Sequence, residues 1–174
     1  NLIALAYRNT EVYELNQAIR HHLKQQGELK DTFTLSGQEY AIGDRIRFPQ
    51  NDNHGQFVKN LNKDQNEIQI QFKGIKNGTF GTIEAYDEKV SLFTGTMVRT
   101  VTVALEKNRR VCFNPEEYQH ITHGYAMGVH KSEGGTFDKS YVSLDPLLDP
   151  STLLVGLTRH RLDTELYVNR EEFI

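Results

Sequence analysis

The sequence predicts an α/β domain built from the two ends of the chain, with a small all-β module inserted between them. Three observations lead to this prediction. The chain opens with a strand and a capped helix, its middle shows only short β-type runs, and strands and helices alternate again after Pro115. Strand–helix alternation is typical of a parallel sheet, and evenly spaced short strands are typical of a small barrel. We therefore expect the α/β domain at residues 1–30 and 115–174 and the inserted β module at 31–114.

The first 27 residues predict a strand followed by a helix. Residues 2–7 are a short apolar run with polar flanks, which indicates a buried strand. Asn9 and Thr10 can cap the helix that follows, because apolar residues recur at helical spacing from 11 to 26. Gly27 then ends the helix.

Short runs of β character fill the middle of the chain. Asn77-Gly78, between two such runs, is a strong signal for a hairpin turn. Alternation of charged and apolar residues at 45–48 indicates a strand with one buried and one solvated face. Residues 50–66 are polar, so we expect a mobile loop there. The expected strands are 39–41, 45–48, 68–72, 81–86, 100–105 and 110–113.

The last third returns to mixed α/β character. We expect a helical stretch to begin near Tyr125 and a strand at 140–144. An acidic loop bounded by prolines follows at 145–149. Leucines at helical spacing predict a helix over 151–161, and a final buried strand is expected at 166–168.

Length and composition limit the class of protein. The chain has 174 residues, of which 37% are hydrophobic and 25% charged, enough for one ordinary domain or two small ones. No apolar run approaches the ~18 residues that span a bilayer, and no signal peptide opens the chain. The single cysteine suits a reducing compartment. We expect a cytoplasmic protein without membrane contact and, because no Met opens the sequence, a piece of a longer protein.

The formal net charge of -3 argues against a strongly basic nucleic-acid binder. The charge is unevenly distributed. Residues 1–30 and 31–114 each carry a net +1, whereas 115–174 carry -5. The acidic excess therefore lies in the C-terminal third.

One candidate binding segment combines polar side chains with glycines. His130, Lys131 and Ser132 are followed closely by Gly134 and Gly135, and glycines allow a backbone to approach a phosphate. The alternative is an ordinary glycine-rich surface loop. The segment is not a Walker A loop, because Gly-Lys-Ser/Thr never occurs in the sequence.

Three arginines are candidate anion contacts. Arg159 and Arg161 lie near the end of an otherwise apolar helix, where they suit a phosphate clamp or an arginine finger. The alternative is that they pair with Asp163 and Glu165. Arg8 follows the first strand, and ligands of open α/β sheets bind where strands end.

A metal site and a cysteine nucleophile are both disfavoured. His120, His123 and His130 have no cysteine or carboxylate at a recognised ligand spacing, so we expect no metal. Cys112 lies in a β-type run without an obvious base, which indicates a buried structural thiol.

Four segments, in order, resemble the C-terminal half of superfamily 1 helicases of the RecD-like branch, closest to the helicase part of TraA-type conjugative relaxases. The fourth helicase motif is matched by Arg8 with LNQAIR at 15–20, and the fifth, typically HKSQG, by HKSEG at 130–134. The sixth is matched by GLTRHR at 156–161. The inserted β module of the family is matched by segments at 43–52 and 75–83.

This resemblance implies a second RecA-like domain, which is discontinuous and carries an inserted SH3-like barrel. In such motors ATP and Mg²⁺ bind between two RecA-like domains. Arg159 would be the catalytic arginine finger and Arg8 a second ATP-phosphate contact. Gly134 would let the backbone approach ATP. The first RecA-like domain of the parent chain would then be a necessary partner.

The resemblance also implies a track for single-stranded DNA. His130, Lys131 and Ser132 would lie on or near it, with the inserted barrel beside it. Two residues depart from the family pattern: Glu133 replaces the usual Gln, and Thr136 stands where many members carry Glu.

The expected function is therefore that of a C-terminal motor fragment of an ATP-dependent 5′–3′ DNA helicase from a conjugative relaxase. Because the Walker A and B motifs are absent, the chain alone is expected to hydrolyse no ATP. Two alternatives stay open: a fragment of a RecD-like repair helicase, and a non-enzymatic nucleic-acid-binding module.

Overall fold

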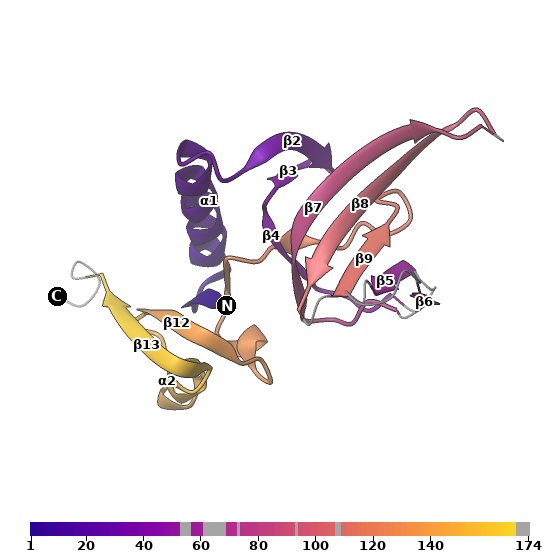
Figure 1. Cartoon of the computed structure of the whole chain (residues 1–174). Helices are drawn as coiled ribbons and strands as arrows, with labels where there is room; N and C mark the ends of the chain where they lie inside the picture. Colours follow the sequence, from indigo (N-terminus) through magenta and orange to yellow (C-terminus); the bar gives the residue numbers. More distant parts are fainter. Residues whose placement is uncertain (53–56, 61–68, 73, 93, 107–108, 170–174) are drawn as a thin grey trace. The chain divides into compact units, whose positions relative to one another are not determined.

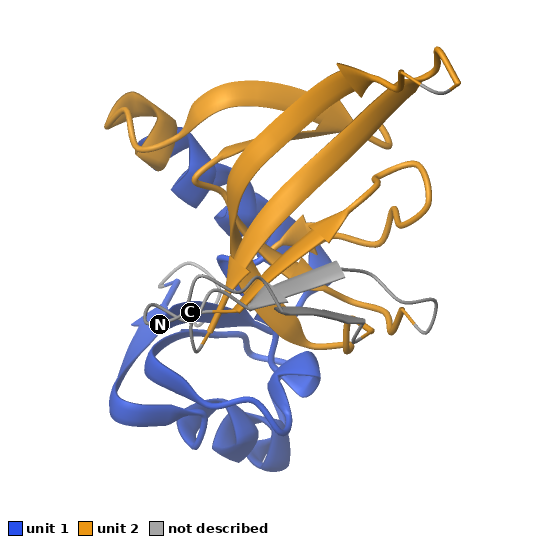
Figure 2. Ribbon diagram, turned by 45° about the vertical axis from the view of Figure 1, so that its right-hand side comes forward, with its two compact units in different colours: residues 1–22, 124–174 blue, residues 23–123 orange. Residues whose placement is uncertain are grey.

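The structure is a computed structural model that describes residues 1–52, 57–60, 69–72, 74–92, 94–106 and 109–169. The chain forms two compact units, each of which is described by itself (Figure 2). Unit 1 consists of residues 1–22 and 124–174, and unit 2 consists of residues 23–123. A parallel α/β unit interrupted by an antiparallel β unit confirms the predicted fold class.

Unit 1 is built on a parallel sheet with the strand order β11-β1-β12-β13 (Figure 1). Helix α1 begins in this unit and runs a short way into unit 2. The elements in chain order are β1 (Leu2–Ala6), α1 (Asn9–Gln25), β11 (Ala126–Gly128), the short 3-10 helix η1 (His130–Ser132), β12 (Phe137–Leu144), α2 (Pro150–Leu157) and β13 (His160–Val168).

Apolar strand centres form the core of this sheet. Leu5 of β1 lies beside Val142 of β12 on one side and Met127 of β11 on the other. Leu5 and Val142 are fully buried. Helix α2 packs closely on them, because a Cβ added at Gly156 would meet Val142 at 3.4 Å. The small residue therefore lets the helix approach the sheet.

The prediction of a helix that begins near Tyr125 is wrong. Residues Ala126–Gly128 form the strand β11, which pairs in parallel with β1. A short apolar run has no length over which helix and strand periods can be distinguished. Pairing with a strand 122 residues away in the sequence decides the conformation, with Ala126 beside Ala4.

The helix predicted over 151–161 is also too long. α2 ends at Leu157, and β13 begins at His160, so the strand expected at 166–168 is only the end of a longer one. The backbone leaves the helix when the carbonyl of Arg159 accepts a hydrogen bond of 2.8 Å from the Phe137 amide of β12. This bond belongs to the sheet and has no signal in the local sequence.

Unit 2 consists of antiparallel strands. Seven of them form a sheet in the order β10-β4-β7-β8-β9-β5-β6, and β2 pairs with β3 in a separate hairpin. The strands are β2 (Lys30–Leu35), β3 (Gln38–Ile42), β4 (Arg45–Phe48), β5 (Phe57–Asn60), β6 (Gln69–Phe72), β7 (Thr79–Val90), β8 (Met97–Leu105), β9 (Arg109–Phe113) and β10 (Thr122–His123). The comparison of this unit with an SH3-like barrel stays a prediction.

The prediction of a mobile loop at residues 50–66 is partly wrong. Within 50–66, residues Phe57–Asn60 form β5, which pairs with β9 and β6. Residues 53–56 and 61–66 lie outside the described part of the chain. Pairing with β6 on one side and β9 on the other forms this strand within an otherwise polar segment.

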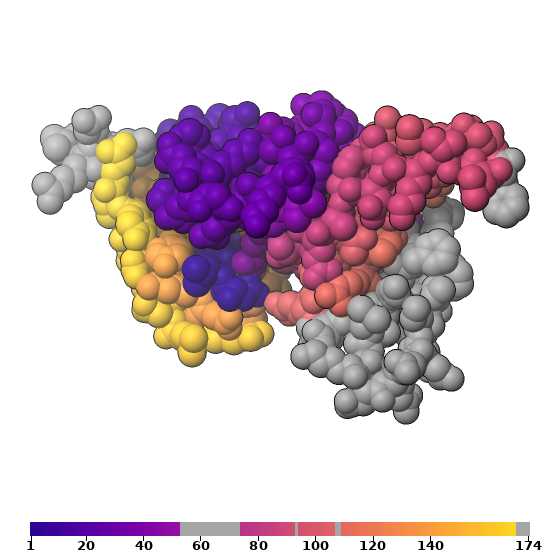
Figure 3. All heavy atoms as spheres, turned by 45° about the horizontal axis from the view of Figure 1, so that its top comes forward, coloured from indigo at the N-terminus to yellow at the C-terminus, as the bar shows by residue number. Residues whose placement is uncertain are grey.

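The core of unit 2 is aromatic and β-branched. Phe48, Val103 and Val111 are fully buried, and Phe48 contacts Phe113 edge-on with ring centroids 5.8 Å apart. The long strands β7 and β8 continue beyond their neighbours as a two-stranded ribbon. The outer end of this ribbon is exposed, with Leu92 99% exposed (Figures 1 and 3).

Two further findings concern only the residues that the structure describes. None of their helices is long and apolar enough to cross a membrane. No group of three His, Cys, Asp or Glu side chains among them could hold a metal ion. The thiol of Cys112 is half-buried rather than fully buried, and its Sγ lies 3.4 Å from the Thr102 hydroxyl.

Candidate functional site

Three neighbouring strands of unit 1 end at the same edge of the parallel sheet, which we call the carboxyl edge. β11 is followed there by the η1 turn, β1 by Tyr7 and Arg8, and β12 by Asp145. These segments are far apart in the sequence. Because parallel strands share one direction, the fold alone brings them to one edge, which is where open α/β sheets bind ligands.

The first contact at the carboxyl edge joins β1 to the η1 turn. The rings of Tyr7 and His130 lie with centroids 5.9 Å apart and planes tilted by 55°. A hydrogen bond of 3.0 Å from the Val129 amide to the Ala6 carbonyl holds the two segments together. His130 and Lys131 are both exposed. Two predicted site residues therefore lie beside the end of β1.

An ion pair fixes the predicted anion contact at this edge. Arg8 Nε lies 2.5 Å from Asp145 Oδ2. The Asp145 side chain is 4% exposed, whereas that of Arg8 is 47% exposed. Asp145 is itself held, because its Oδ1 accepts a 2.8 Å hydrogen bond from the Leu147 amide. A buried carboxylate thus orients a half-exposed guanidinium.

Ser132 has a different place from its neighbours. Its side chain is fully buried, and its hydroxyl donates a 2.6 Å hydrogen bond to the Val129 carbonyl. The hydroxyl therefore closes the η1 turn that presents His130 and Lys131. The Ser132 hydroxyl is engaged within the turn. We therefore assign Ser132 the role of supporting the η1 turn, in place of the predicted direct contact with DNA.

The other predicted residues lie in the turn between η1 and β12 and beside the amino ends of β12 and β13, which we call the amino edge. Gly134 lies in the turn before β12 with a φ of +79°, a left-handed conformation that glycine adopts without strain. Arg159 precedes β13 and bonds the first residue of β12 through its carbonyl. Glu133 and Thr136, the departures from the family pattern, are both exposed on the same turn as Gly134.

The Arg159 guanidinium contacts the end of helix α2. Its Nε donates to the Val155 carbonyl at 3.0 Å, and one Nη donates to the Thr158 hydroxyl at 3.1 Å. Within the described ranges it forms no ion pair with a carboxylate. The cation is therefore uncompensated locally, and its other Nη is left without a partner among those residues.

The alternative pairing of the arginines with Asp163 and Glu165 is wrong. Both carboxylates bind Lys139 instead. Hydrogen bonding with Glu165 raises the pKa of Lys139 above its usual range. Arg161 pairs with Asp138 instead, with Nη1 and Oδ1 3.4 Å apart. Cross-strand partners on β12 thus take precedence over neighbours along β13.

Arg8 and Arg159 lie beside different ends of β12. Arg8 pairs with Asp145, which follows the strand, whereas the Arg159 carbonyl bonds its first residue, Phe137. Helix α2 passes between the two ends, because a Cβ added at Gly156 would lie 3.5 Å from Val129, beside the η1 turn. The assignment of both arginines to the phosphate of ATP stays a prediction.

Sequence reasoning gave no role to Asn16, which anchors helix α1 to the sheet. Its Nδ2 donates to the Val12 and Ala126 carbonyls at 2.9 and 3.0 Å. Its Oδ1 accepts from the Tyr125 and Ala126 amides, both at 3.0 Å. Every donor and acceptor of the buried amide is used. The signal available in the sequence was a polar residue at a position where the helix pattern predicts burial.

Solved structures share the fold of this chain. A Pif1 helicase from Candida albicans aligns with 99% of this chain and 47% of its own at 14% identity, with a TM-score of 0.53. A Pif1 helicase from Bacteroides, crystallised with ADP-AlF3 and single-stranded DNA, aligns with all of this chain and 42% of its own at 18% identity and a TM-score of 0.47. The first of these likenesses supports a RecA-like parallel sheet with inserted β elements.

Sequence similarity points to a more particular relative. A Sinorhizobium fredii protein named as a probable conjugal transfer protein TraA is 28% identical over 98% of this chain. The chain spans 14% of that protein's length. No model of a protein family matches the chain. The comparisons confirm the resemblance to TraA-type proteins, and the SH3-like barrel stays a prediction.

Proposed function

We propose that this chain belongs to the second RecA-like half of a helicase motor in a conjugative DNA-transfer protein, and that its carboxyl edge holds single-stranded DNA. The observation that carries the proposal is the convergence of Tyr7, Arg8 and the η1 turn at that edge. The TraA name of the relative favours a conjugative parent over a repair helicase.

The carboxyl edge has the chemistry that a single strand needs. Arg8 and Lys131 supply cations for the backbone phosphates, and the rings of Tyr7 and His130 supply surfaces on which bases stack. Such contacts are local, so they do not require a basic protein. A motor must also release its strand in every cycle, which suits a few contacts better than a strongly positive surface.

The amino edge suits a phosphate of a nucleotide held by another domain. Arg159 has no carboxylate partner in the described part of unit 1, so its charge is available to an anion. Gly134 leaves open space where a Cβ would stand. When bound, ATP with Mg²⁺ would supply the free energy for movement along DNA. The 5′–3′ direction and the finger role of Arg159 are part of the same proposal.

A binding experiment with the chain itself tests the DNA-binding edge. Replacing both Arg8 and Lys131 by Ala removes two phosphate contacts, so we expect the affinity for a dT20 oligonucleotide to fall about tenfold or more in low salt. The slope of log K against log salt should become shallower by roughly 1.4, at ~0.7 per contact. Fluorescence anisotropy at several salt concentrations measures both.

The matched control is Arg159→Ala, which removes a cation at the amino edge. We expect it to change dT20 affinity by less than about threefold. If Arg159→Ala weakens binding as much as the double variant does, the strand does not follow the carboxyl edge. An unchanged salt slope in the double variant would likewise exclude Arg8 and Lys131 from the track.

A further inference from the structure

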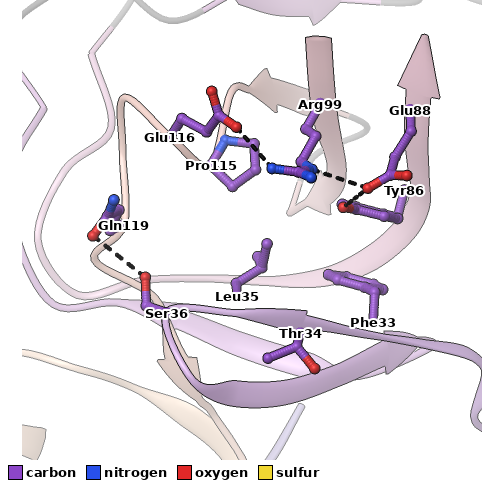
Figure 4. Close-up of a pocket in the computed structure, with 10 residues that line it drawn as sticks. All are labelled: Phe33, Thr34, Leu35, Ser36, Tyr86, Glu88, Arg99, Pro115, Glu116 and Gln119. Atoms are coloured by element: carbon purple, nitrogen blue, oxygen red, sulfur yellow. Dashed lines mark hydrogen bonds and ion pairs between the residues drawn. The ribbon is translucent and has the colours of Figure 1, made fainter. Parts of the chain in front are cut away.

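Unit 2 contains a cleft of about 580 Å³ between the β2–β3 hairpin, strands β7 and β8, and the segment that follows β9 (Figure 4). All of its lining residues belong to this unit. The cleft contains none of the residues assigned above to DNA or nucleotide. Its lining combines an aromatic wall, an apolar floor and a rim of charges, so we considered which ligand fits all three.

Two parallel aromatic rings form one wall. Phe33 of β2 and Tyr86 of β7 stack with centroids 4.2 Å apart and planes 4° apart. Leu35 and Pro115 add apolar surface beside them. Aromatic grooves of this kind bind extended peptides, since proline and other apolar side chains pack on the rings with little loss of conformational entropy.

A chain of charged groups forms the rim. Arg99 Nε lies 2.9 Å from Glu88, and its Nη1 lies 2.8 Å from Glu116. The Tyr86 hydroxyl donates a 2.6 Å hydrogen bond to Glu88. Figure 4 shows Arg99 between the two carboxylates at the edge of the cleft.

The rim has a net charge of -1, because the two carboxylates of Glu88 and Glu116 face the single guanidinium of Arg99. Hydrogen bonds from Tyr86, and then from Arg99, hold the pKa of Glu88 below its usual range, so this carboxylate stays ionised. Two carboxylates share the single guanidinium of Arg99. The described contacts use only one oxygen of Glu88 and one of Glu116, which leaves the second oxygen of each for another donor.

This charge distinguishes between two kinds of ligand. The phosphates of a nucleic acid would be repelled by the surplus carboxylate, and Arg99 is already engaged by two acids. A lysine or arginine side chain would instead pair with the free carboxylate oxygens. The cleft is therefore complementary to a cationic peptide and not to a DNA strand.

We propose that this cleft binds an extended segment of a partner protein that places proline or another apolar residue on Phe33 and Tyr86 and a basic side chain between Glu88 and Glu116. This site is independent of the DNA-binding edge of unit 1. It gives the inserted β unit a protein-recruiting role in addition to any part that it takes in DNA binding.

The test is an NMR titration of the ¹⁵N-labelled 174-residue chain with a probe peptide of six prolines, two leucines and two arginines. We expect fast-exchange shifts confined to amides around the cleft and a Kd in the range of about 10–500 μM, as weak short-peptide contacts give. A second peptide with both arginines replaced by glutamate should bind at least fivefold more weakly.

Variants of the rim identify the site. Glu116→Gln and the double variant Glu88→Gln/Glu116→Gln should weaken the arginine peptide about 2-fold and 5-fold or more. Glu117→Gln is the matched control, because Glu117 is the exposed neighbour of Glu116 and does not line the cleft. It should leave binding unchanged.

The proposal is overturned by any of three results that need no variant. These are no shift with 1 mM arginine peptide, equal binding of the glutamate peptide, and shifts of the cleft amides by a dT10 oligonucleotide. The last result would make the cleft a nucleic-acid site. Retained peptide binding by the folded double variant would also show that the Glu88 and Glu116 carboxylates do not bind the peptide.

Discussion

Arg8 and Asp145 form an ion pair in which the carboxylate is buried and the guanidinium is half exposed. An unpaired carboxylate at this position would be costly, so Arg8 stays attached to the edge. The exposed half of its side chain can still meet a phosphate. One residue thus serves the fold and the proposed DNA contact together.

Arg159 gives the residue-scale prediction for ATP turnover. In the full-length parent, Arg159→Ala should lower the rate of ATP hydrolysis by about 10³-fold or more, because an arginine finger stabilises charge that develops during phosphoryl transfer. Steady-state turnover with saturating single-stranded DNA is the measurement. DNA affinity should stay within a few-fold.

Arg161→Ala is the control for that measurement. Arg161 lies two positions further along the chain but pairs with Asp138, so turnover in this variant should stay close to that of the parent. Comparable loss in both variants would assign the effect to the strand β13 and not to the Arg159 guanidinium.

At the scale of the element, hydrogen bonds of the Asn16 side-chain amide hold helix α1 to the sheet. Asn16→Ala removes the hydrogen bonds that the side chain makes with the backbone of Tyr125 and Ala126, so the free energy of unfolding should fall by about 2–4 kcal/mol. Urea denaturation followed by circular dichroism measures the change. Glu14→Ala, an exposed change on the same helix, should stay within about 0.5 kcal/mol.

Helix α2 depends on Asp149, whose carboxylate accepts hydrogen bonds from the Ser151 and Thr152 amides. The Thr152 hydroxyl and amide lower the pKa of Asp149 below its usual range. The ionised cap therefore contributes stability above pH ~4, the ordinary value for Asp, and loses it as the pH falls through the lower folded value.

This linkage can be measured against a variant that caps without titrating. Asp149→Asn keeps an oxygen acceptor at every pH. The advantage of the wild-type chain over Asp149→Asn in thermal unfolding should shrink between pH 6 and pH 2.5. Glu133→Gln should show no such trend, and an advantage that grows on acidification would contradict the role of the Asp149 carboxylate.

Elements with strong local signals could be predicted from the sequence. The capped amphipathic pattern near residues 9–26 matches α1, and the apolar run at the start matches β1. The fold class could be predicted too. β11 could not, because its conformation depends on pairing with β1 rather than on its own three residues.

The same reason limits prediction of the site. The residue types were visible, but the contact of Tyr7 with His130 and that of Arg8 with Asp145 follow from strand order and direction. Motif spacing carries no information about which edge of the sheet a residue occupies. The burial of Ser132 was hidden as well, because polar residues in a glycine-rich segment are expected to be exposed.

At the scale of the whole molecule, two tasks fall to two units. In the proposed function, unit 1 holds a nucleic-acid strand at its carboxyl edge and contacts a nucleotide through Arg159. Unit 2 carries a cleft whose charge suits a basic peptide. The net charge of -3 is compatible with this proposal, because DNA would be held by a small number of local cations.

The central claim is that single-stranded DNA lies along the carboxyl edge of the unit 1 sheet. The most direct measurement is an NMR titration of the ¹⁵N-labelled chain with dT8 in low salt. The account predicts shifts that centre on Tyr7, Arg8 and residues 130–131, with the amide of Arg159 little changed. Shifts centred on Arg159, or none at all near Arg8, would contradict it.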